Sequence, residues 1–183
     1  WMMTIANKHR IDEQEYIKGE LNSTIKHELI NGEVFAMVGA SAVHNVISGN
    51  IFTALSNHLK GKPCRPFMND MKVRIAENFY YPDVLVDCSK LSPNMYFLET
   101  PILIVEVLSA STKSYDKTFK LQQYQLIPTL QEYLMVDQDR QWVELRSRLD
   151  DWQPQYYEMG DELIVQAVGL KLAVADVYDG IDF

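Results

Sequence analysis

The sequence predicts an α+β fold with a mixed central β-sheet flanked by helices, and three features support this prediction. Two continuously apolar runs, Val84–Val86 and Ile102–Val107, are typical of strands that are covered on both faces. A segment with helical character, about residues 112–126, follows the second run and ends near Ile127-Pro128. Helices early in the chain, a helical crossover in the middle and a strand-rich tail together indicate an α+β arrangement.

Length and composition favour a single domain over residues 1–183. The chain has 47% apolar and 23% charged residues, which is typical of a globular protein with a sizeable core. Trp1 precedes two methionines, an unusual start, so we expect residues 1–10 to be a flexible or artificially added N-terminus.

The net charge of −8 limits the classes of nucleic-acid-binding protein that the chain can represent. Proteins that bind nucleic acid by bulk charge normally have a basic footprint, which this composition disfavours. A nuclease is not excluded, because bound metal cations offset the charge of its carboxylates.

The sequence also predicts a cytoplasmic protein that does not associate with a membrane. No apolar run approaches the roughly 18–20 residues of a membrane span, and the N-terminus lacks the apolar segment of a signal peptide. Cys64 and Cys88 have neither CxxC spacing nor a nearby pair of histidines. We therefore expect two free thiols, as in cytosolic proteins.

The first elements are expected to be a short helix and a hairpin. Residues 11–17 indicate a polar helix that ends at Gly19. Asn31-Gly32 between two β-type runs is a strong hairpin signal. Alternation along the first strand places Glu28 on the same face as Ile30, which is an unusual environment for a carboxylate.

The remaining elements follow from spacing and from turn residues. A helix is expected from about Gly39 to Lys60, because its apolar residues recur at helical intervals and Gly61-Lys62-Pro63 stops it. Residues 78–80 are expected to form a turn before the central runs. Further strands are predicted at residues 71–75, 132–137, 142–146, 152–157 and 163–165, followed by a terminal helix at residues 174–178.

Two acids on the central strands are the main candidates for catalysis. Glu106 lies inside an otherwise apolar run, where an ionised group is rarely found unpaired, and Asp83 precedes the other run. Carboxylates are the hard oxygen ligands that Mg²⁺ or Mn²⁺ prefers, and a bound cation would offset their desolvation. Asp83 could instead cap a turn.

Lys120 lies on the following helix in line with Asp116 and Tyr124, at intervals of four residues. A lysine beside the metal can orient water and stabilise the charge that develops on phosphate. A solvated lysine in an i,i+4 pair with Asp116 is an alternative, and Tyr124 could simply pack. His44 is a candidate for contacting substrate, or a residue of a helix start.

These residues also carry a resemblance to a known family. Glu28 to Val34, Gly39 with His44, Tyr81-Pro82-Asp83, residues 104–109 and residues 111–137 together resemble the Uma-type restriction endonucleases. The resemblance implies the restriction endonuclease-like fold of the PD-(D/E)xK nuclease superfamily, an α/β/α-like arrangement, and a homodimer.

The resemblance further implies roles for individual residues. Asp83 and Glu106 would bind the metal, with Glu28 as a third acid from an N-terminal element. The simple motif has lysine two residues after the acid, where this chain has Leu108. The resemblance therefore points to Lys120 as the lysine that is supplied by the following helix.

The leading hypothesis is a Mg²⁺- or Mn²⁺-dependent endonuclease that hydrolyses phosphodiester bonds of DNA. The alternative is a catalytically inactive protein of the same fold that binds nucleic acid or a protein partner. A hydrolase of small phosphorylated substrates is a third hypothesis, although no Gly-rich phosphate-binding loop is present. The choice between DNA and RNA stays open at this point.

Overall fold

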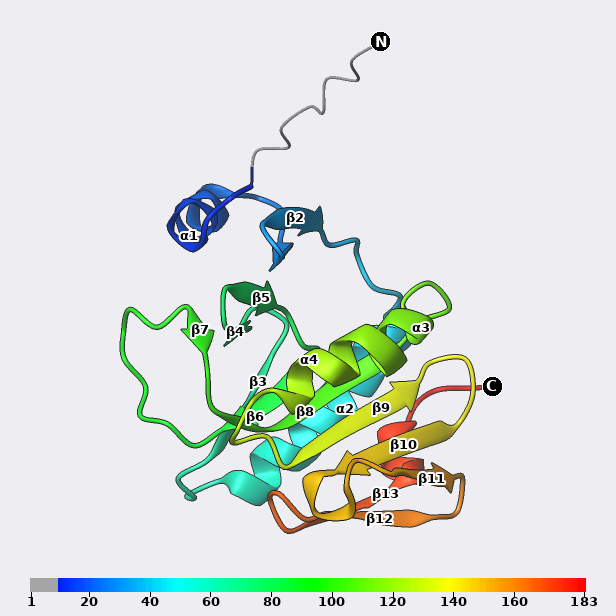
Figure 1. Cartoon of the computed structure of the whole chain (residues 1–183). Helices are drawn as coiled ribbons and strands as arrows, with labels where there is room; N and C mark the ends of the chain where they lie inside the picture. The colour runs from blue at the N-terminus through cyan, green and yellow to red at the C-terminus, as the bar shows by residue number, and fades with distance from the viewer. Residues whose placement is uncertain (1–9) are drawn as a thin grey trace.

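A six-stranded mixed sheet forms the centre of the computed structural model, which describes residues 10–183 (Figure 1). The expectation for the extreme N-terminus therefore lies, except at residue 10, outside the described residues. In spatial order the strands are β11 (Pro154–Glu158), β10 (Trp142–Ser147), β9 (Glu132–Asp137), β8 (Pro101–Leu108), β6 (Val84–Asp87) and β3 (Arg65–Met68). Strands β8 and β9 are parallel and the other neighbours are antiparallel, as the single helical crossover predicts.

Helices cover both faces of this sheet. Helix α2 (Ala42–Leu59) packs on one face. The other face is covered by one continuous helical segment, made of α3 (Lys113–Tyr115), a π-helical turn η1 (Asp116–Lys120) and α4 (Leu121–Gln125). The expected helix at residues 112–126 is thus present, with a π-helical turn in its middle.

Alternation along β8 fixes which helix each side chain meets. Val105 and Val107 belong to the apolar cluster beneath α2, whereas Ile104 and Leu108 pack with the residues of α4. Glu106 therefore points toward the α3–α4 side, since successive side chains of a strand face opposite ways.

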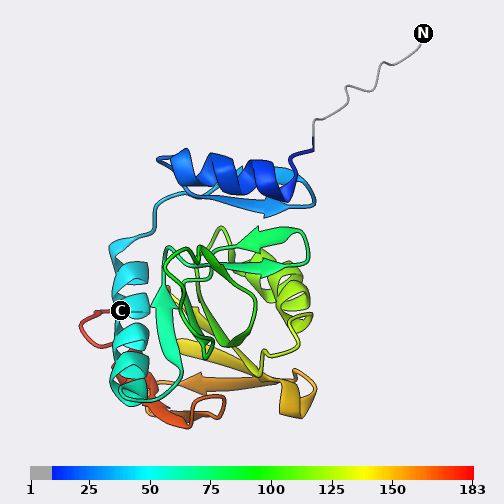
Figure 2. The ribbon, with the colours of Figure 1, turned by 90° about the vertical axis from the view of Figure 1, so that its left-hand side faces the viewer.

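A second sheet lies beside the first. Its strands, in spatial order, are β2 (Glu33–Ala36), β1 (His27–Ile30), β5 (Asn78–Tyr80), β4 (Lys72–Ile75) and β7 (Phe97–Leu98). Helix α1 (Glu13–Asn22) packs on this sheet through Tyr16, which contacts Phe79 in a cluster with Leu29. Figure 2 shows α1 and the β1–β2 hairpin as a layer at one end of the molecule.

The predicted hairpin is confirmed. Asn31 and Gly32 have φ values of 51° and 77°, which the mirror-image turn of a two-residue hairpin requires, and Ile30 pairs with Glu33. Leu29 packs toward α1, while Ile30 packs with the cluster beneath α4. Glu28 therefore shares the face of Ile30, as the alternation predicts, and it is buried.

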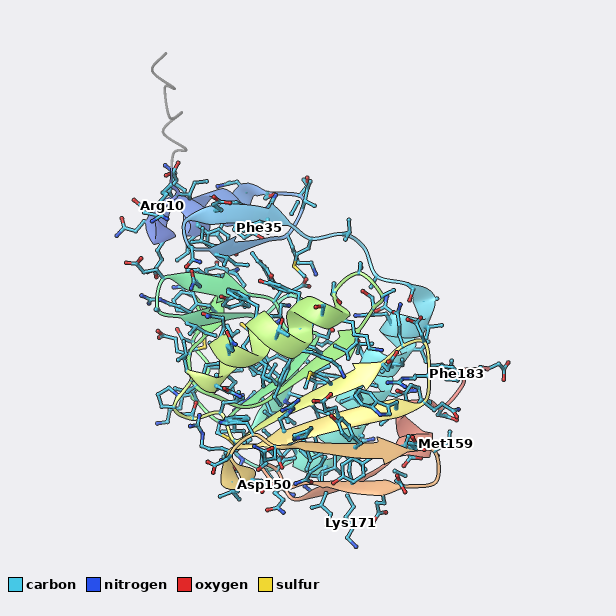
Figure 3. The ribbon with its side chains drawn as sticks, turned by 45° about the vertical axis from the view of Figure 1, so that its right-hand side comes forward. Arg10, Phe35, Asp150, Met159, Lys171 and Phe183 are labelled. Carbon is cyan, nitrogen blue, oxygen red and sulfur yellow. A yellow bond between two sulfur atoms is a disulfide. The ribbon has the colours of Figure 1, made fainter. Side chains whose placement is uncertain are left out.

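The C-terminal part continues the chain beneath α2. It contains the 3₁₀ turn η2 (Arg148–Asp150), the two-stranded sheet of β12 (Glu162–Val165) and β13 (Leu170–Ala173), and α5 (Val174–Val177). Figure 3 labels Met159 and Lys171 at this end of the molecule. Val174 and Val177 join the apolar cluster of α2, and Asn50 of α2 donates a hydrogen bond to the carbonyl of Val177 (3.1 Å).

Some predicted boundaries are wrong for identifiable reasons. Helix α1 continues through Gly19 to Asn22, because a single glycine does not outweigh the packing of the helix on the sheet. Residues 78–80 form strand β5 rather than a turn, since the chain reverses one step earlier, at Ala76 with its φ of 52°. The predicted elements also do not include β3, β7 and β13.

The prediction of two free thiols is wrong, because Cys64 and Cys88 form a disulfide. Strands β3 and β6 pair antiparallel with Arg65 opposite Asp87, which brings the two cysteines just beyond that pair within a Cα–Cα distance of 3.9 Å. The spacing of the two cysteines in the sequence does not predict this disulfide. It follows only from the pairing of β3 with β6, and β3 was not among the predicted strands. Separately, no helix among residues 10–183 has the length and apolar character needed to cross a membrane.

Candidate active site

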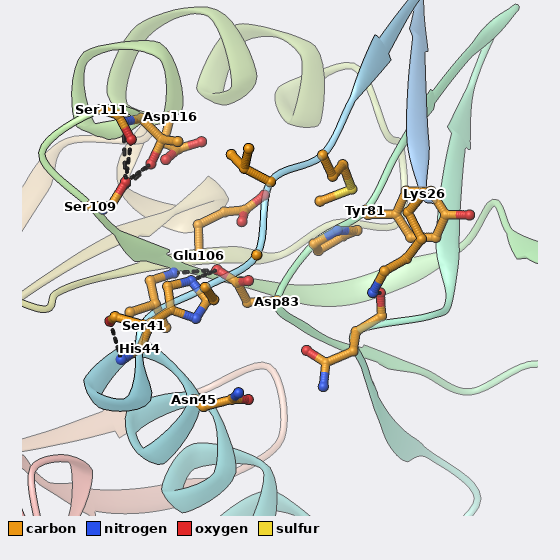
Figure 4. A pocket seen from close by; sticks show the side chains of 18 of the residues that line it. Lys26, Ser41, His44, Asn45, Tyr81, Asp83, Glu106, Ser109, Ser111 and Asp116 are labelled. Carbon is orange, nitrogen blue, oxygen red and sulfur yellow. Dashed lines mark hydrogen bonds and ion pairs between the residues drawn. The ribbon is translucent and has the colours of Figure 1, made fainter. Parts of the chain in front are cut away.

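A cavity of about 700 Å³ lies where the hairpin, the start of α2 and the end of β8 meet (Figure 4). Five of the seven residues singled out in the sequence line it: Asp83, Glu106, His44, Asp116 and Lys120. The other two, Glu28 and Tyr124, do not line the cavity but contact residues that do. Glu28 pairs with Lys120 and Tyr124 donates a hydrogen bond to Glu106. Residues from five separate parts of the chain thus converge on one place.

Asp83 is held by a backbone donor and by a histidine. It lies one residue before β6, and its Oδ2 accepts a hydrogen bond from the backbone N–H of Val107 (2.7 Å). Nε2 of His44 lies 3.2 Å from the same oxygen (Figure 4). Both contacts fall on Oδ2, which leaves Oδ1 for a further ligand.

His44 owes its position to the start of α2. Ser41 caps this helix by accepting a hydrogen bond from the backbone N–H of His44 (3.1 Å). Burial alone would lower the pKa of His44, but the hydrogen bond and the charge of Asp83 outweigh it, so the pKa is raised. Asp83 therefore stabilises the protonated form of His44.

Glu106 is nearly inaccessible, with 4% of its surface exposed. Its Oε1 accepts hydrogen bonds from Nζ of Lys120 (3.1 Å) and from the hydroxyl of Tyr124 (2.7 Å), which leaves Oε2 for another ligand. Burial raises the pKa of Glu106 well above its usual value. Lys120 opposes this rise, and the charges of Asp83 and Asp116 add to it.

Lys120 is the centre of a cluster of carboxylates. Its Nζ lies 3.1 Å from Glu106, 3.3 Å from Glu28 and 3.6 Å from Asp116, and the residue is only 6% exposed. Burial acts to lower the pKa of Lys120, but the three carboxylates raise it well above its usual value. We conclude that Lys120 carries its charge and that its partners hold it in place.

The π-helical turn sets the direction of these side chains. Tyr133 of β9 reaches into the helical segment and donates a hydrogen bond to the carbonyl of Asp116 (3.2 Å). A backbone group that bonds outside the helix disturbs the regular i→i−4 ladder, and π-helical turns are frequent at functional sites. Asp116 and Lys120, the ends of this turn, are both buried against the sheet.

The charge balance of the group fits a divalent cation. Four carboxylates, Asp83, Glu106, Glu28 and Asp116, face two cationic groups, Lys120 and His44. No three His, Cys, Asp or Glu side chains in the described part of the chain form a closed metal cluster. Mg²⁺ commonly uses one or two carboxylates together with water and substrate phosphate, so Oδ1 of Asp83 and Oε2 of Glu106 suit it.

Sequence reasoning missed the groups that position these side chains. The N–H of Val107 holds Asp83, and the N–H of Tyr81 donates to Oε1 of Glu28 (3.0 Å); backbone donors have no sequence signature. Tyr115 was also missed. Its hydroxyl is the one buried side-chain polar atom within residues 10–183 that has no hydrogen-bond partner.

A family model described as "Putative restriction endonuclease", Uma2, matches residues 13–175. Two proteins of Synechocystis, both named as uncharacterized, are similar over most of their length. The first, slr1290, is 36% identical over 179 residues, covering 95% of this chain and 94% of the relative. The second, sll1609, is 37% identical over 159 residues, covering 78% and 90%.

A crystal structure from Anabaena variabilis, titled a "putative nuclease", superposes with a TM-score of 0.76. It is 18% identical in sequence, and the match covers 92% of this chain and 97% of that one. The predicted fold class, a restriction endonuclease-like α+β fold, is thereby confirmed. With the family model spanning nearly all of the described residues, the predicted family is confirmed as well: the chain belongs to the Uma2 family.

Proposed function

We propose that this protein is a metal-dependent endonuclease that hydrolyses phosphodiester bonds of DNA. The observation that carries the proposal is Glu106, a buried carboxylate on a central strand that accepts hydrogen bonds from Lys120 and Tyr124 through Oε1 alone and lines the same cavity as Asp83. Membership of the Uma2 family supports a nuclease.

The carboxylates Asp83 and Glu106 would hold Mg²⁺ or Mn²⁺. When bound, such an ion supplies an acidified water molecule and offsets negative charge on the phosphate. Glu28 helps to position Lys120, because its Oε1 forms an ion pair with Nζ of Lys120 at 3.3 Å. The resemblance implies Glu28 as a metal ligand, although Glu28 is not among the residues that line the cavity.

The other residues orient these two acids. Lys120 and Tyr124 fix Oε1 of Glu106, so that Oε2 keeps one direction. His44 and the N–H of Val107 do the same for Asp83 through Oδ2. Asp116 balances the charge of Lys120. The geometry favours Lys120 as a positioning and charge-balancing group, with the nucleophilic water on the side of the open carboxylate oxygens.

A cleavage assay tests this proposal. Labelled DNA and RNA oligonucleotides are incubated with the full chain in Mg²⁺ or Mn²⁺, using wild type, Glu106→Gln and a matched control, Glu132→Gln. Glu132 is a buried glutamate on the neighbouring strand that bonds the N–H of Ala167 and does not line the cavity. We expect cleavage that is lost in Glu106→Gln and kept in Glu132→Gln. Equal cleavage by both variants would show that Glu106 is not required for catalysis and would refute the proposed site.

A second candidate function is binding without catalysis. It is favoured by Lys120, which is surrounded by three carboxylates and hardly exposed, and by Leu108 at the motif position where lysine is expected. This candidate predicts no turnover with any metal and nucleic-acid or protein binding that survives loss of Asp83.

The finer features of the proposal are a homodimer and a cytoplasmic location. The homodimer is what the family resemblance implies, and sedimentation equilibrium of the full chain tests it. Because Cys64 and Cys88 form a disulfide, the cysteines do not support a cytoplasmic location. Fractionation of the cells that make the protein tests the location.

A further inference from the structure

We propose that the substrate enters the site as an unpaired nucleotide, with its base on an apolar rim formed by Ile25, Met37 and Val38, so that single-stranded nucleic acid is preferred to a duplex. This inference rests on the proposed function only for the position of the reacting phosphate. Three independent features of the described residues support it: the rim, the burial of Glu106 and the scarcity of unpaired cations around the cavity.

The apolar rim is built by the hairpin and by the chain that leaves it. The N–H of Met37 bonds the carbonyl of Lys26 (2.8 Å), which extends the pairing of β1 with β2 by one step. Glu28 lies opposite Phe35 in the same register, and paired residues of antiparallel strands share a face. Lys26, Glu28, Phe35 and Met37 therefore lie on the side of the hairpin that faces the carboxylates.

The rim is exposed although it is apolar. Val38 is 91% exposed and Ile25 is 55% exposed, and both line the cavity together with Met37. Contiguous exposed apolar side chains that are bordered by polar groups mark interaction surfaces, and we infer this role for the rim. Apolar and aromatic ligand groups, such as nucleobases, suit such a surface, and apolar side chains contact unstacked bases in many nucleic-acid complexes.

The burial of Glu106 favours an unpaired nucleotide over the backbone of an undistorted duplex. Glu106 is almost fully buried and lines the cavity. The cavity has a volume of about 700 Å³, which is in the range that encloses a ligand of small-molecule size. One nucleotide fits this description. We infer that a phosphate approaches Glu106 when its own nucleotide enters the cavity, as an unpaired or extruded nucleotide does.

The charges around the cavity also disfavour a duplex. Among the described residues that line it, the lysines are Lys26 and Lys120, and there is no arginine. Lys120 is held by its carboxylates, Lys26 pairs with Asp70 at 2.9 Å, and His44 pairs with Asp83 at 3.2 Å. A groove that follows a duplex normally presents several cations to phosphates. On the opposite side of the cavity, the hydroxyls of Ser109, Ser111 and Thr112 form a hydrogen-bonded group that can contact a single phosphate or sugar.

Binding tests the inference without depending on catalysis. Fluorescence anisotropy measures the Kd of the full chain, in Ca²⁺, for a labelled single-stranded DNA, the same strand in a blunt duplex, and the single-stranded RNA of the same sequence. The variants are the rim double substitution Met37→Ser/Val38→Ser and a control, Leu149→Ser, which alters an exposed apolar residue outside the cavity. Because apolar side chains can contact unpaired bases but not the faces of bases stacked in a duplex, we expect a preference for single strands of about tenfold, which the rim variant reduces and the control keeps.

Each outcome bears on the inference. A duplex that binds as tightly as the single strand, a rim variant that behaves as the control does, or no binding to any of the three would overturn it. Preferred binding to single strands without cleavage in Mg²⁺ or Mn²⁺ would overturn the proposed function and leave the inference standing. The two single strands identify the sugar, since a tighter complex with one of them assigns DNA or RNA.

Discussion

Removal of the charge of Lys120 should destabilise the fold strongly. In Lys120→Met, a buried cation with three carboxylates within 3.6 Å is lost, so Glu28, Glu106 and Asp116 either stay charged without compensation or take up protons at a cost in free energy. Breaking a buried ion pair by removing one partner costs about 3–5 kcal/mol, because an uncompensated charge stays buried. For a domain of this length that loss corresponds to a decrease in Tm of roughly 6–20 °C.

Urea denaturation at neutral pH, followed by circular dichroism, measures this change. Lys171→Met is the matched control, because Lys171 is an exposed lysine paired with Glu162 at 3.9 Å, and the loss of an exposed pair costs less than about 1 kcal/mol. The sign with pH is also fixed. The pKa of Lys120 is raised in the folded state, so its contribution is fully present at neutral pH and is lost only as the pH rises through that raised pKa. Equal stability of Lys120→Met and Lys171→Met would refute the carboxylate cluster.

Three further predictions follow from single contacts. His44→Ala should lower the free energy of unfolding more at about pH 5.5 than at about pH 8.5. The pKa of His44 is raised in the folded state, so its pair with Asp83 stabilises the fold fully below the ordinary pKa of histidine, and this contribution is lost as the pH rises through the raised pKa. Equal losses at the two pH values in urea denaturation would contradict this prediction. Cys64→Ser should lower the free energy of unfolding by about 3 kcal/mol, since Cys88 lies 24 residues away and the bond closes a loop of that length; wild type under reducing conditions is the comparison, and an unchanged urea midpoint would argue against the disulfide. Tyr115→Phe should be neutral or stabilising by up to about 1 kcal/mol, because it removes a buried hydroxyl that has no partner; a marked loss of stability would show that this hydroxyl is satisfied.

The central strands and their acids could be predicted because burial leaves a direct mark on a sequence. An acid inside a run such as Ile102–Leu108 stands out, and Glu106 does lie buried against Lys120. The Asn31-Gly32 hairpin was equally predictable, since few other turns use that pair. Alternation in β1 then placed Glu28 on the correct face.

What could not be predicted depends on pairing between distant segments. The disulfide requires β3 to lie beside β6, and short, partly buried strands such as Arg65–Met68 have little periodicity to reveal them. The π-helical turn accepts a hydrogen bond from Tyr133, which belongs to strand β9 and not to the helical segment. The support of Asp83 by a backbone N–H could not be predicted either, because any residue other than proline at position 107 could supply that donor.

The apolar rim is a similar case. Ile25, Met37 and Val38 belong to runs that predict a hairpin with ordinary apolar positions, and nothing in those runs says that their side chains stay in solvent. Their exposure follows from the position of the hairpin at the mouth of the cavity. A sequence pattern predicts which residues can share a face, whereas packing of other segments decides whether that face is covered.

The central claim is that Asp83 and Glu106 form one metal site. Isothermal titration calorimetry of the full chain with Mn²⁺ and with Mg²⁺ tests it most directly, comparing wild type, Asp83→Asn and Glu106→Gln with the control Glu132→Gln. The account predicts binding by wild type and by the control, and its loss in each of the two site variants while circular dichroism shows that both are folded. Metal binding that persists in either folded site variant, or no binding by wild type, would contradict the claim.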